Sequence, residues 1–231
     1  MGLPQNLGSV VTAIGGLGTA AFGLLEAVKA VLSPINLIGF PYIHNVISGL
    51  TPSEAGAGSP TNSLPQTNVV ATLRANWING TDLTSQKAIA KSLIKLHLSP
   101  GNAAALAAKT NLDAAQLTQV AICMATGTPL TQEQSDAYSR FDLIVTAMLD
   151  EAYQHSDQVY RNWTRALAGL IAVIVAVLGG WNLAVAENYW GSHEMWQAVL
   201  VGMLATPLAP IAKDISSALA TAVNTLQAVK K

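Results

Sequence analysis

Long stretches without a charged residue dominate the pattern of hydrophobic and polar positions along the chain. The clearest is residues 166–186, ALAGLIAVIVAVLGGWNLAVA, which Arg161 and Arg165 precede and Glu187 follows. About 20 apolar residues in a helix cross the hydrocarbon core of a bilayer. The stretch therefore predicts a transmembrane helix, because the alternative, a buried helix of a soluble protein, rarely has so long an uncharged run.

A shorter hydrophobic stretch follows at residues 196–212. Its two prolines each remove a backbone donor and favour a kink. With residues 166–186 it predicts a helical hairpin. The connecting loop is acidic and supplies aromatic rings suited to a membrane interface: Tyr189, Trp190 and Trp196.

The third hydrophobic stretch, residues 9–25, is diluted by Gly and Thr. It predicts either a spanning helix or an interfacial or re-entrant one. Gly15, Thr19 and Gly23 are four residues apart and form a small-residue face on which another helix could pack closely in lipid. The alternative is that small residues are simply common in membrane helices.

The positions of Lys and Arg indicate an orientation. If all three stretches cross the membrane, the cations near their ends fall on one side: Lys29, Arg161, Arg165, Lys213, Lys230 and Lys231. By the positive-inside rule, the N-terminus is outside and the middle region and C-terminus are cytoplasmic. We expect an integral protein of a bacterial inner membrane.

The pattern divides the chain into four parts. These are an N-terminal membrane helix with an interfacial segment (1–47), a Pro/Gly/Ser-rich linker (48–68), a short-helix soluble region (69–130), and a long helix with a transmembrane hairpin and amphipathic tail (131–231). The interfacial segment is predicted from apolar residues interrupted by Pro34, Gly39 and Pro41.

Side chains able to cap helices recur in the middle region: Thr84, Ser99, Asp113 and Thr131. They predict three short helices, near 84–97, 100–109 and 113–125. A long helix should begin at Gln132 and continue into residues 166–186, with an apolar stripe that includes Phe141, Val145 and Met148. This stripe should pack either on the short helices or on another subunit.

Lys87, Lys91 and Lys95 recur every four residues on the first short helix. They form one basic stripe, which could face anionic lipid. A solvated helix face is the other interpretation.

Composition narrows the function classes. Only 11% of residues are charged, against about 25% in an average soluble protein. The net charge of -1 gives no field that would attract nucleic acid, so no nucleic-acid partner is expected. Cys123 is the single cysteine, which excludes an internal disulfide and a multi-cysteine metal site. No metalloprotease, phosphate-loop or nucleophile-elbow motif occurs, so we expect neither an enzyme nor a cofactor or metal.

Several residues of the long helix and the segment after Thr206 carry a family resemblance: on the helix they are Phe141-Asp142, Met148, Asp150, Tyr160-Arg161 and Arg165. With them, residues 131–231 resemble the C-terminal half of a family of uncharacterised bacterial integral membrane proteins. In that family a membrane-proximal helix leads into a hydrophobic hairpin with a short acidic loop and a closing helix. The chain departs from the family pattern at Asn182, which lacks the acid that follows it there. The resemblance implies membrane location and no particular activity.

Together these patterns predict an all-α membrane protein with about three transmembrane helices, a small cytoplasmic helical region and a long helix that runs into the membrane. The expected function is that of a non-enzymatic membrane subunit with a structural or assembly role, in a homo-oligomer or as an accessory subunit of a larger complex. The expected partners are the lipid bilayer and either further copies of the chain or other membrane subunits. The alternative is a component of an oligomeric channel or transporter.

Overall fold

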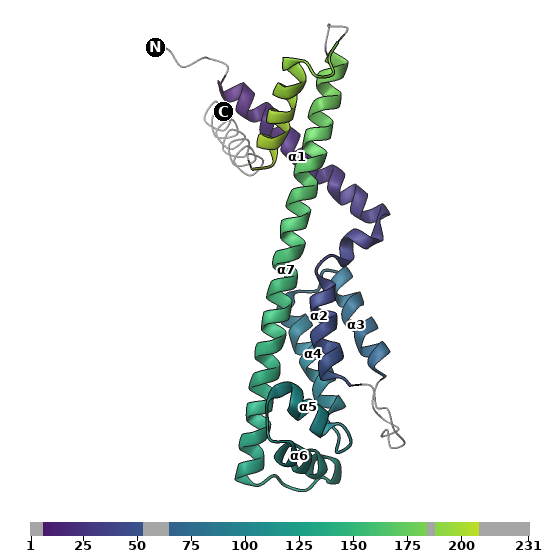
Figure 1. The fold of residues 1–231 in the computed structure, drawn as a ribbon, viewed down its shortest axis with the longest axis vertical. Coiled ribbons are helices and arrows are strands. Elements are labelled where there is room, and N and C mark those ends of the chain that lie inside the picture. The colour runs from purple at the N-terminus through teal and green to yellow at the C-terminus, as the bar shows by residue number, and fades with distance from the viewer. Residues whose placement is uncertain (1–6, 53–64, 184–187, 208–231) are drawn as a thin grey trace, which may run out of the picture. The chain divides into compact units, whose positions relative to one another are not determined.

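The structure is a computed structural model that describes residues 7–52, 65–183 and 188–207. It divides into two compact units: a core unit, residues 34–160, and a terminal unit, residues 1–33 together with 161–231. The described residues are helices joined by short turns, with no strand among them (Figure 1). The predicted all-α class is therefore confirmed.

Six helical elements and the first part of a seventh make up the core unit. They are η1 (Ser33–Leu37), α2 (Phe40–Leu50), α3 (Gln66–Ile78), α4 (Leu83–His97), α5 (Ala103–Thr110), α6 (Ala114–Thr126) and α7 (Gln132–Leu183), of which residues 132–160 belong here. The predicted long helix is confirmed, from its first residue onward into the hydrophobic stretch.

Local capping explains where the middle helices start. The Asp113 carboxylate accepts a hydrogen bond from the Gln116 amide at 2.8 Å and begins α6. Thr131 and Gln134 exchange two hydrogen bonds, a capping box that begins α7. Both starts match the sequence prediction.

Two other predicted starts are wrong. Helix α4 is capped by Asp82, which accepts from the Ser85 amide at 2.9 Å, and Thr84 lies inside the helix. Helix α5 begins after Asn102, whose side-chain oxygen accepts from the Ser99 amide at 2.8 Å. The residues after Ser99 thus form a turn, since an Asn side chain readily bonds to nearby backbone amides.

The core of this unit is built from large apolar side chains. Phe141, Val145 and Leu149 of α7 are buried against residues of α2 to α6, including Ile94, Leu106 and Leu117. The α7 stripe therefore packs on the short helices, the first of the two alternatives predicted for it. Burial of each such side chain contributes about 1.5–3 kcal/mol.

Helix α2 differs from the interfacial segment predicted there. Pro41 lies in its first turn, where a missing amide hydrogen costs nothing, so the proline starts the helix rather than breaking it. Four apolar side chains of α2 are then buried in the protein core rather than at a lipid surface: Phe40, Ile43, Ile47 and Leu50.

Helix α3 also lies where the sequence suggested little structure. Its first residues, from Gln66, fall in the predicted linker 48–68, of which residues 53–64 lie outside the described residues.

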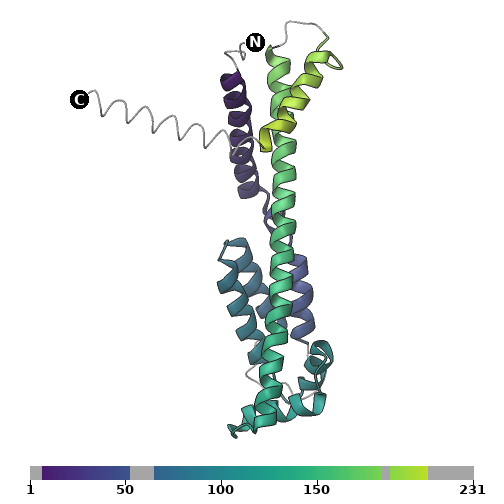
Figure 2. The ribbon, with the colours of Figure 1, turned by 90° about the vertical axis from the view of Figure 1, so that its left-hand side faces the viewer.

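The terminal unit contains α1 (Leu7–Val31), residues 161–183 of α7 and a helix over residues 193–207. Figures 1 and 2 show α1 in purple and residues 193–207 in yellow-green beside the second part of α7. They meet at a cluster of three alanines, Ala21, Ala172 and Ala205. The predicted amphipathic tail beyond residue 207 lies outside the described residues.

Candidate functional site

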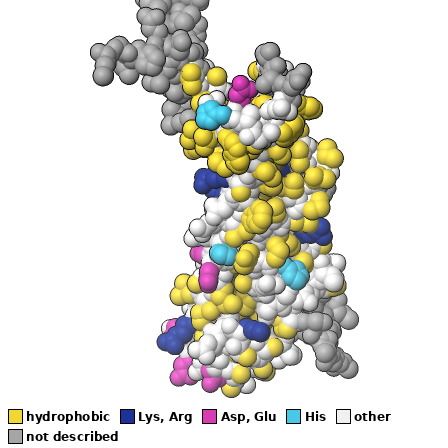
Figure 3. All heavy atoms as spheres, turned by 45° about the horizontal axis from the view of Figure 1, so that its top comes forward, with side chains coloured by type: hydrophobic (Ala, Val, Ile, Leu, Met, Phe, Trp, Pro, Cys, Tyr) yellow, Lys and Arg dark blue, Asp and Glu magenta, His cyan; other side chains and the backbone are white. Residues whose placement is uncertain are grey.

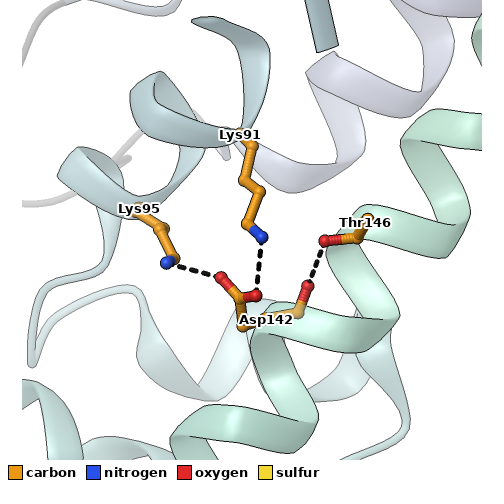
Figure 4. Close-up of polar contacts among 4 residues, drawn as sticks. All are labelled: Lys91, Lys95, Asp142 and Thr146. Carbon is orange, nitrogen blue, oxygen red and sulfur yellow. Dashed lines mark hydrogen bonds and ion pairs between the residues drawn. The ribbon is translucent and has the colours of Figure 1, made fainter. Parts of the chain in front are cut away.

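The predicted basic stripe on α4 faces acidic side chains of α7 (Figure 4). The Lys91 and Lys95 ammonium groups bind the two carboxylate oxygens of Asp142, at 2.6 and 2.5 Å. Lys87 pairs with Asp150 at 2.5 Å. Since the lysine numbers rise as the aspartate numbers fall, these contacts fix α4 antiparallel to α7.

Asp142 lies at the centre of this network. Burial alone would raise the pKa of its carboxyl group, but hydrogen bonds from Lys91 and Lys95, together with their charges, hold the pKa below its usual value. The same hydrogen bond raises the pKa of Lys95, whose ammonium also lies 5.2 Å from the Tyr138 ring centre. The Asp142 carboxylate and the Lys95 ammonium group thus stay ionised across the neutral pH range.

The three lysines therefore have protein partners, which differs from both sequence interpretations, a lipid-facing stripe and a solvated face. Lys87, Lys91 and Lys95 are each partly exposed, with about 30% of the side chain accessible. A signal was present in the sequence, because Asp142 and Asp150 are eight residues apart, like Lys87 and Lys95. That match indicates pairing only once the two helices are known to pack.

The small-residue face predicted on α1 is not brought together as a unit. Gly15 is buried, whereas Thr19 and Gly23 are exposed, and a Cβ atom added to Gly23 would meet nothing within 4 Å. The packed face of α1 instead carries Ile14, Leu17 and Ala21.

Close backbone approach occurs at other glycines of the terminal unit. A Cβ atom on Gly202 would lie 2.5 Å from the Cα atom of Val173 in α7. A Cβ atom on Gly180 would lie 2.4 Å from the Tyr189 hydroxyl oxygen. Small residues therefore do allow close helix packing here, but on faces that the sequence did not single out.

The predicted interface aromatics divide into two kinds. Tyr189 is buried, and its hydroxyl donates to the Val177 carbonyl oxygen at 3.1 Å, so it ties the connecting loop to α7. Trp190 and Trp196 are 62% and 60% exposed. Trp190 also lies 5.8 Å from the ring of Trp181. A membrane-interface role stays a prediction for the two tryptophans, while Tyr189 has a packing role.

The outer surface of the terminal unit is apolar. On α7, Leu170, Ile174 and Leu178 recur every four residues and are 56%, 48% and 45% exposed. A second stripe lies on residues 193–207 and comprises Trp196, Leu200, Met203 and Leu204. Figure 3 shows hydrophobic side chains widespread on one face of the molecule, with charged ones few and scattered.

In the part of the chain that the structure describes, two helices are long and apolar enough to cross a membrane, Thr12–Val31 and Gln132–Leu183. In their most hydrophobic windows only 28% and 11% of residues are buried, whereas the central helix of a soluble protein is mostly buried. Of the predicted second arm, residues 196–212, the described part ends at residue 207 and does not add a third such helix.

Within the described residues, no group of three or more His, Cys, Asp or Glu side chains could hold a metal ion. Comparisons with protein-family models, with curated proteins and with solved structures found no match for the chain.

Proposed function

We propose that the chain is a non-enzymatic integral membrane subunit with a structural or assembly role, in a homo-oligomer or as an accessory subunit of a larger membrane complex. The observation that carries the proposal is where the apolar residues of the terminal unit lie: mostly small ones inside and large ones outside. Alanines and glycines make up most of its interior, with Leu25 and Tyr189 as larger exceptions, while exposed Leu, Ile, Met and Trp side chains lie on its outside. Water would not stabilise that arrangement, whereas lipid or an apolar partner would.

In the proposed topology, α1, the second part of α7 and the helix over residues 193–207 lie in the membrane, and the core unit is cytoplasmic. The positions of Arg161 and Arg165, between the core unit and the apolar part of α7, support that orientation. Helix α7 belongs to both units, so it would link the cytoplasmic bundle directly to the membrane.

A structural role is favoured over a channel by the chemistry of the best membrane helix. In residues 166–183 the amide-bearing side chain is Asn182, and it bonds to the Leu178 carbonyl oxygen of its own helix at 3.1 Å. A pore needs polar groups that face its lumen.

The single natural cysteine makes the topology testable. Cys123 lies on α6 of the core unit and is partly exposed. In intact bacterial spheroplasts that express the full chain, a membrane-impermeant maleimide should not label Cys123 until the cells are broken. A Cys123→Ser, His193→Cys variant, whose cysteine replaces an exposed residue at the start of the helix over residues 193–207, should be labelled from outside. Labelling of Cys123 in intact spheroplasts, or release of the chain by alkaline carbonate, would refute the proposed topology.

The assembly role needs a separate measurement. Native mass spectrometry of the chain, purified from native membranes in a mild detergent, should show more than one copy or a co-purifying membrane subunit. A lone monomer in both detergent and lipid nanodiscs would overturn it.

A further inference from the structure

A groove on the core unit lies between α2 and α3 and plays no part in the proposed function. Its volume is about 570 Å³, within the range of about 300–1,000 Å³ common for small-molecule sites. Gln66, at the start of α3, donates from its side-chain nitrogen to the Ser48 carbonyl oxygen of α2 at 3.1 Å. This bond joins the two walls, so the packing of the helices fixes the groove.

Among the described residues that line the groove, one carries a permanent charge, the cation Arg74. Arg74 lines it from α3, and His44 and Ser48 line it from α2, with the His44 Nε2 atom 3.5 Å from the Ser48 hydroxyl oxygen. None of the described residues that line the groove is an Asp or a Glu. Arg74 makes no ion pair with any described residue, whereas the three lysines of α4 each have a carboxylate partner. A guanidinium is always charged and binds carboxylate or phosphate through two parallel hydrogen bonds.

Beyond Gln66 and Thr67 in its first turn, the α3 wall on either side of Arg74 is apolar. Val70 and Ala71 lie one turn before Arg74, and Ala75 and Ile78 lie just beyond it. The opposite face of α3 already buries Val69 and Leu73 in the protein core. A helix that is apolar on two faces usually has both covered. On the second face of α3, Val70 packs partly against the core, but Ala71, Ala75 and Ile78 are exposed.

We infer that this groove binds a small amphipathic anion, an organic carboxylate or phosphate monoester whose head pairs with Arg74 and whose apolar part lies along α3. The groove wall can supply both kinds of contact to one ligand: the permanent charge of Arg74 with the Ser48 hydroxyl and the His44 imidazole for the head, and aliphatic side chains of α3 for the apolar part. The head group could belong to a soluble metabolite or to an anionic lipid, which share this chemistry.

The test uses the full chain in nanodiscs of phosphatidylcholine and isothermal titration with hexyl phosphate, with empty nanodiscs as the blank. Inorganic phosphate, which lacks the apolar part, and hexanol, which lacks the head, should each bind at least about tenfold more weakly, since one contact of about 1.4 kcal/mol corresponds to that factor. Arg74→Gln should weaken hexyl phosphate binding by about tenfold or more. Arg140→Gln removes the same charge from an exposed position on α7 outside the groove and should leave the affinity unchanged.

A second variant tests the contact between the apolar part of the ligand and α3. Ala71→Trp fills the groove from an exposed position, where the larger side chain should not disturb the core. It should reduce hexyl phosphate binding to the level of inorganic phosphate. Circular dichroism of each variant should match that of the original chain.

A second set of nanodiscs distinguishes a soluble ligand from an anionic lipid. If anionic lipid fills the groove, phosphatidylglycerol should weaken hexyl phosphate binding in the original chain and in Arg140→Gln. If the ligand is soluble, the lipid should make no difference. Equal affinity in the original chain and in Arg74→Gln, equal binding of phosphate and hexyl phosphate, or no binding at all would overturn the inference. None of these results depends on which side of the membrane labels Cys123, so the inference and the proposed topology can fail separately.

Discussion

The described residues of both units are helical, but the helices of the two units pack through side chains of different size. The core unit buries large side chains such as Phe141, Tyr153 and Ile94 and links α4 to α7 by ion pairs. The terminal unit buries mainly alanines, Ala21, Ala168, Ala172 and Ala205, with Leu25 and Tyr189 as the larger exceptions, and brings backbones together at glycine. In water, the burial of apolar area drives helices together, whereas in lipid that drive is absent and close contact must replace it.

The largest expected effect of a single substitution is in the core unit. Phe141 is fully buried, so Phe141→Ala should lower the free energy of unfolding by about 3–5 kcal/mol. Leu143→Ala is the matched control, because Leu143 lies on the same helix and is 68% exposed. Hydrogen exchange of the full chain in detergent should show lost protection across residues 34–160. Equal effects of the two substitutions would contradict this account of the core.

The core unit also shows which helices can be predicted from the sequence and which cannot. The caps at Asp113 and Thr131 and the apolar period of α7 are local signals, and they located α6 and α7 correctly. Helix α2 was not predicted because Pro41, with Pro34 and Gly39 before it, suggests a break until the place of Pro41 in the first turn is known. The first residues of α3, from Gln66, fall inside the predicted linker because the polar residues around them resemble those of a loop.

The candidate sites were less predictable than the helices, because they depend on tertiary contacts. The stripe of Lys87, Lys91 and Lys95 was visible, but its partners lie far along the chain. The importance of Gly180 and Gly202 depends on the rotation of each helix about its axis, which residue spacing alone does not specify. The groove beside Arg74 carries no motif at all.

The next largest effect should come from the close contact in the terminal unit. Gly202→Ala would place a Cβ atom 2.5 Å from the Cα atom of Val173, so the helices must separate, at a cost of about 1–3 kcal/mol. Gly179→Ala has open space around it and should instead stabilise its helix by up to about 1 kcal/mol. Unfolding by sodium dodecyl sulfate in mixed micelles measures both changes. The comparison of the units fails if the two substitutions shift stability in the same direction.

A smaller effect, with a pH signature, should come from the ion pairs that join α4 to α7 in the core unit. Asp142→Asn leaves Lys91 and Lys95 without their carboxylate and should cost about 1–2 kcal/mol at neutral pH, a modest amount since all three side chains remain partly exposed. The pKa of Asp142 is lowered in the folded chain, so its contribution is present above its usual pKa of 3.8 and is lost as the pH falls through the lower folded value.

Chemical unfolding of the original chain and Asp142→Asn should therefore differ at pH 7 and converge toward about pH 2. Glu151→Gln removes a charge from an exposed position on the same helix and should change little at either pH. A difference between the original chain and Asp142→Asn that persists at the acid end would mean that shape, rather than charge, explains the cost.

The smallest effect should have the opposite sign, and it tests how strictly the core unit depends on apolar burial. The Tyr153 side chain is fully buried on α7, and its hydroxyl has no hydrogen-bond partner among the described residues. Burial raises the pKa of this hydroxyl, so it stays neutral. Because an unpaired buried hydroxyl is itself unfavourable, Tyr153→Phe should be neutral or should stabilise the unit by up to about 1 kcal/mol. The exposed Tyr42→Phe should leave the unfolding midpoint unchanged. A loss of stability in Tyr153→Phe would instead indicate that the hydroxyl is bonded in solution, and the interior of the core unit would then be more polar than its large apolar side chains indicate.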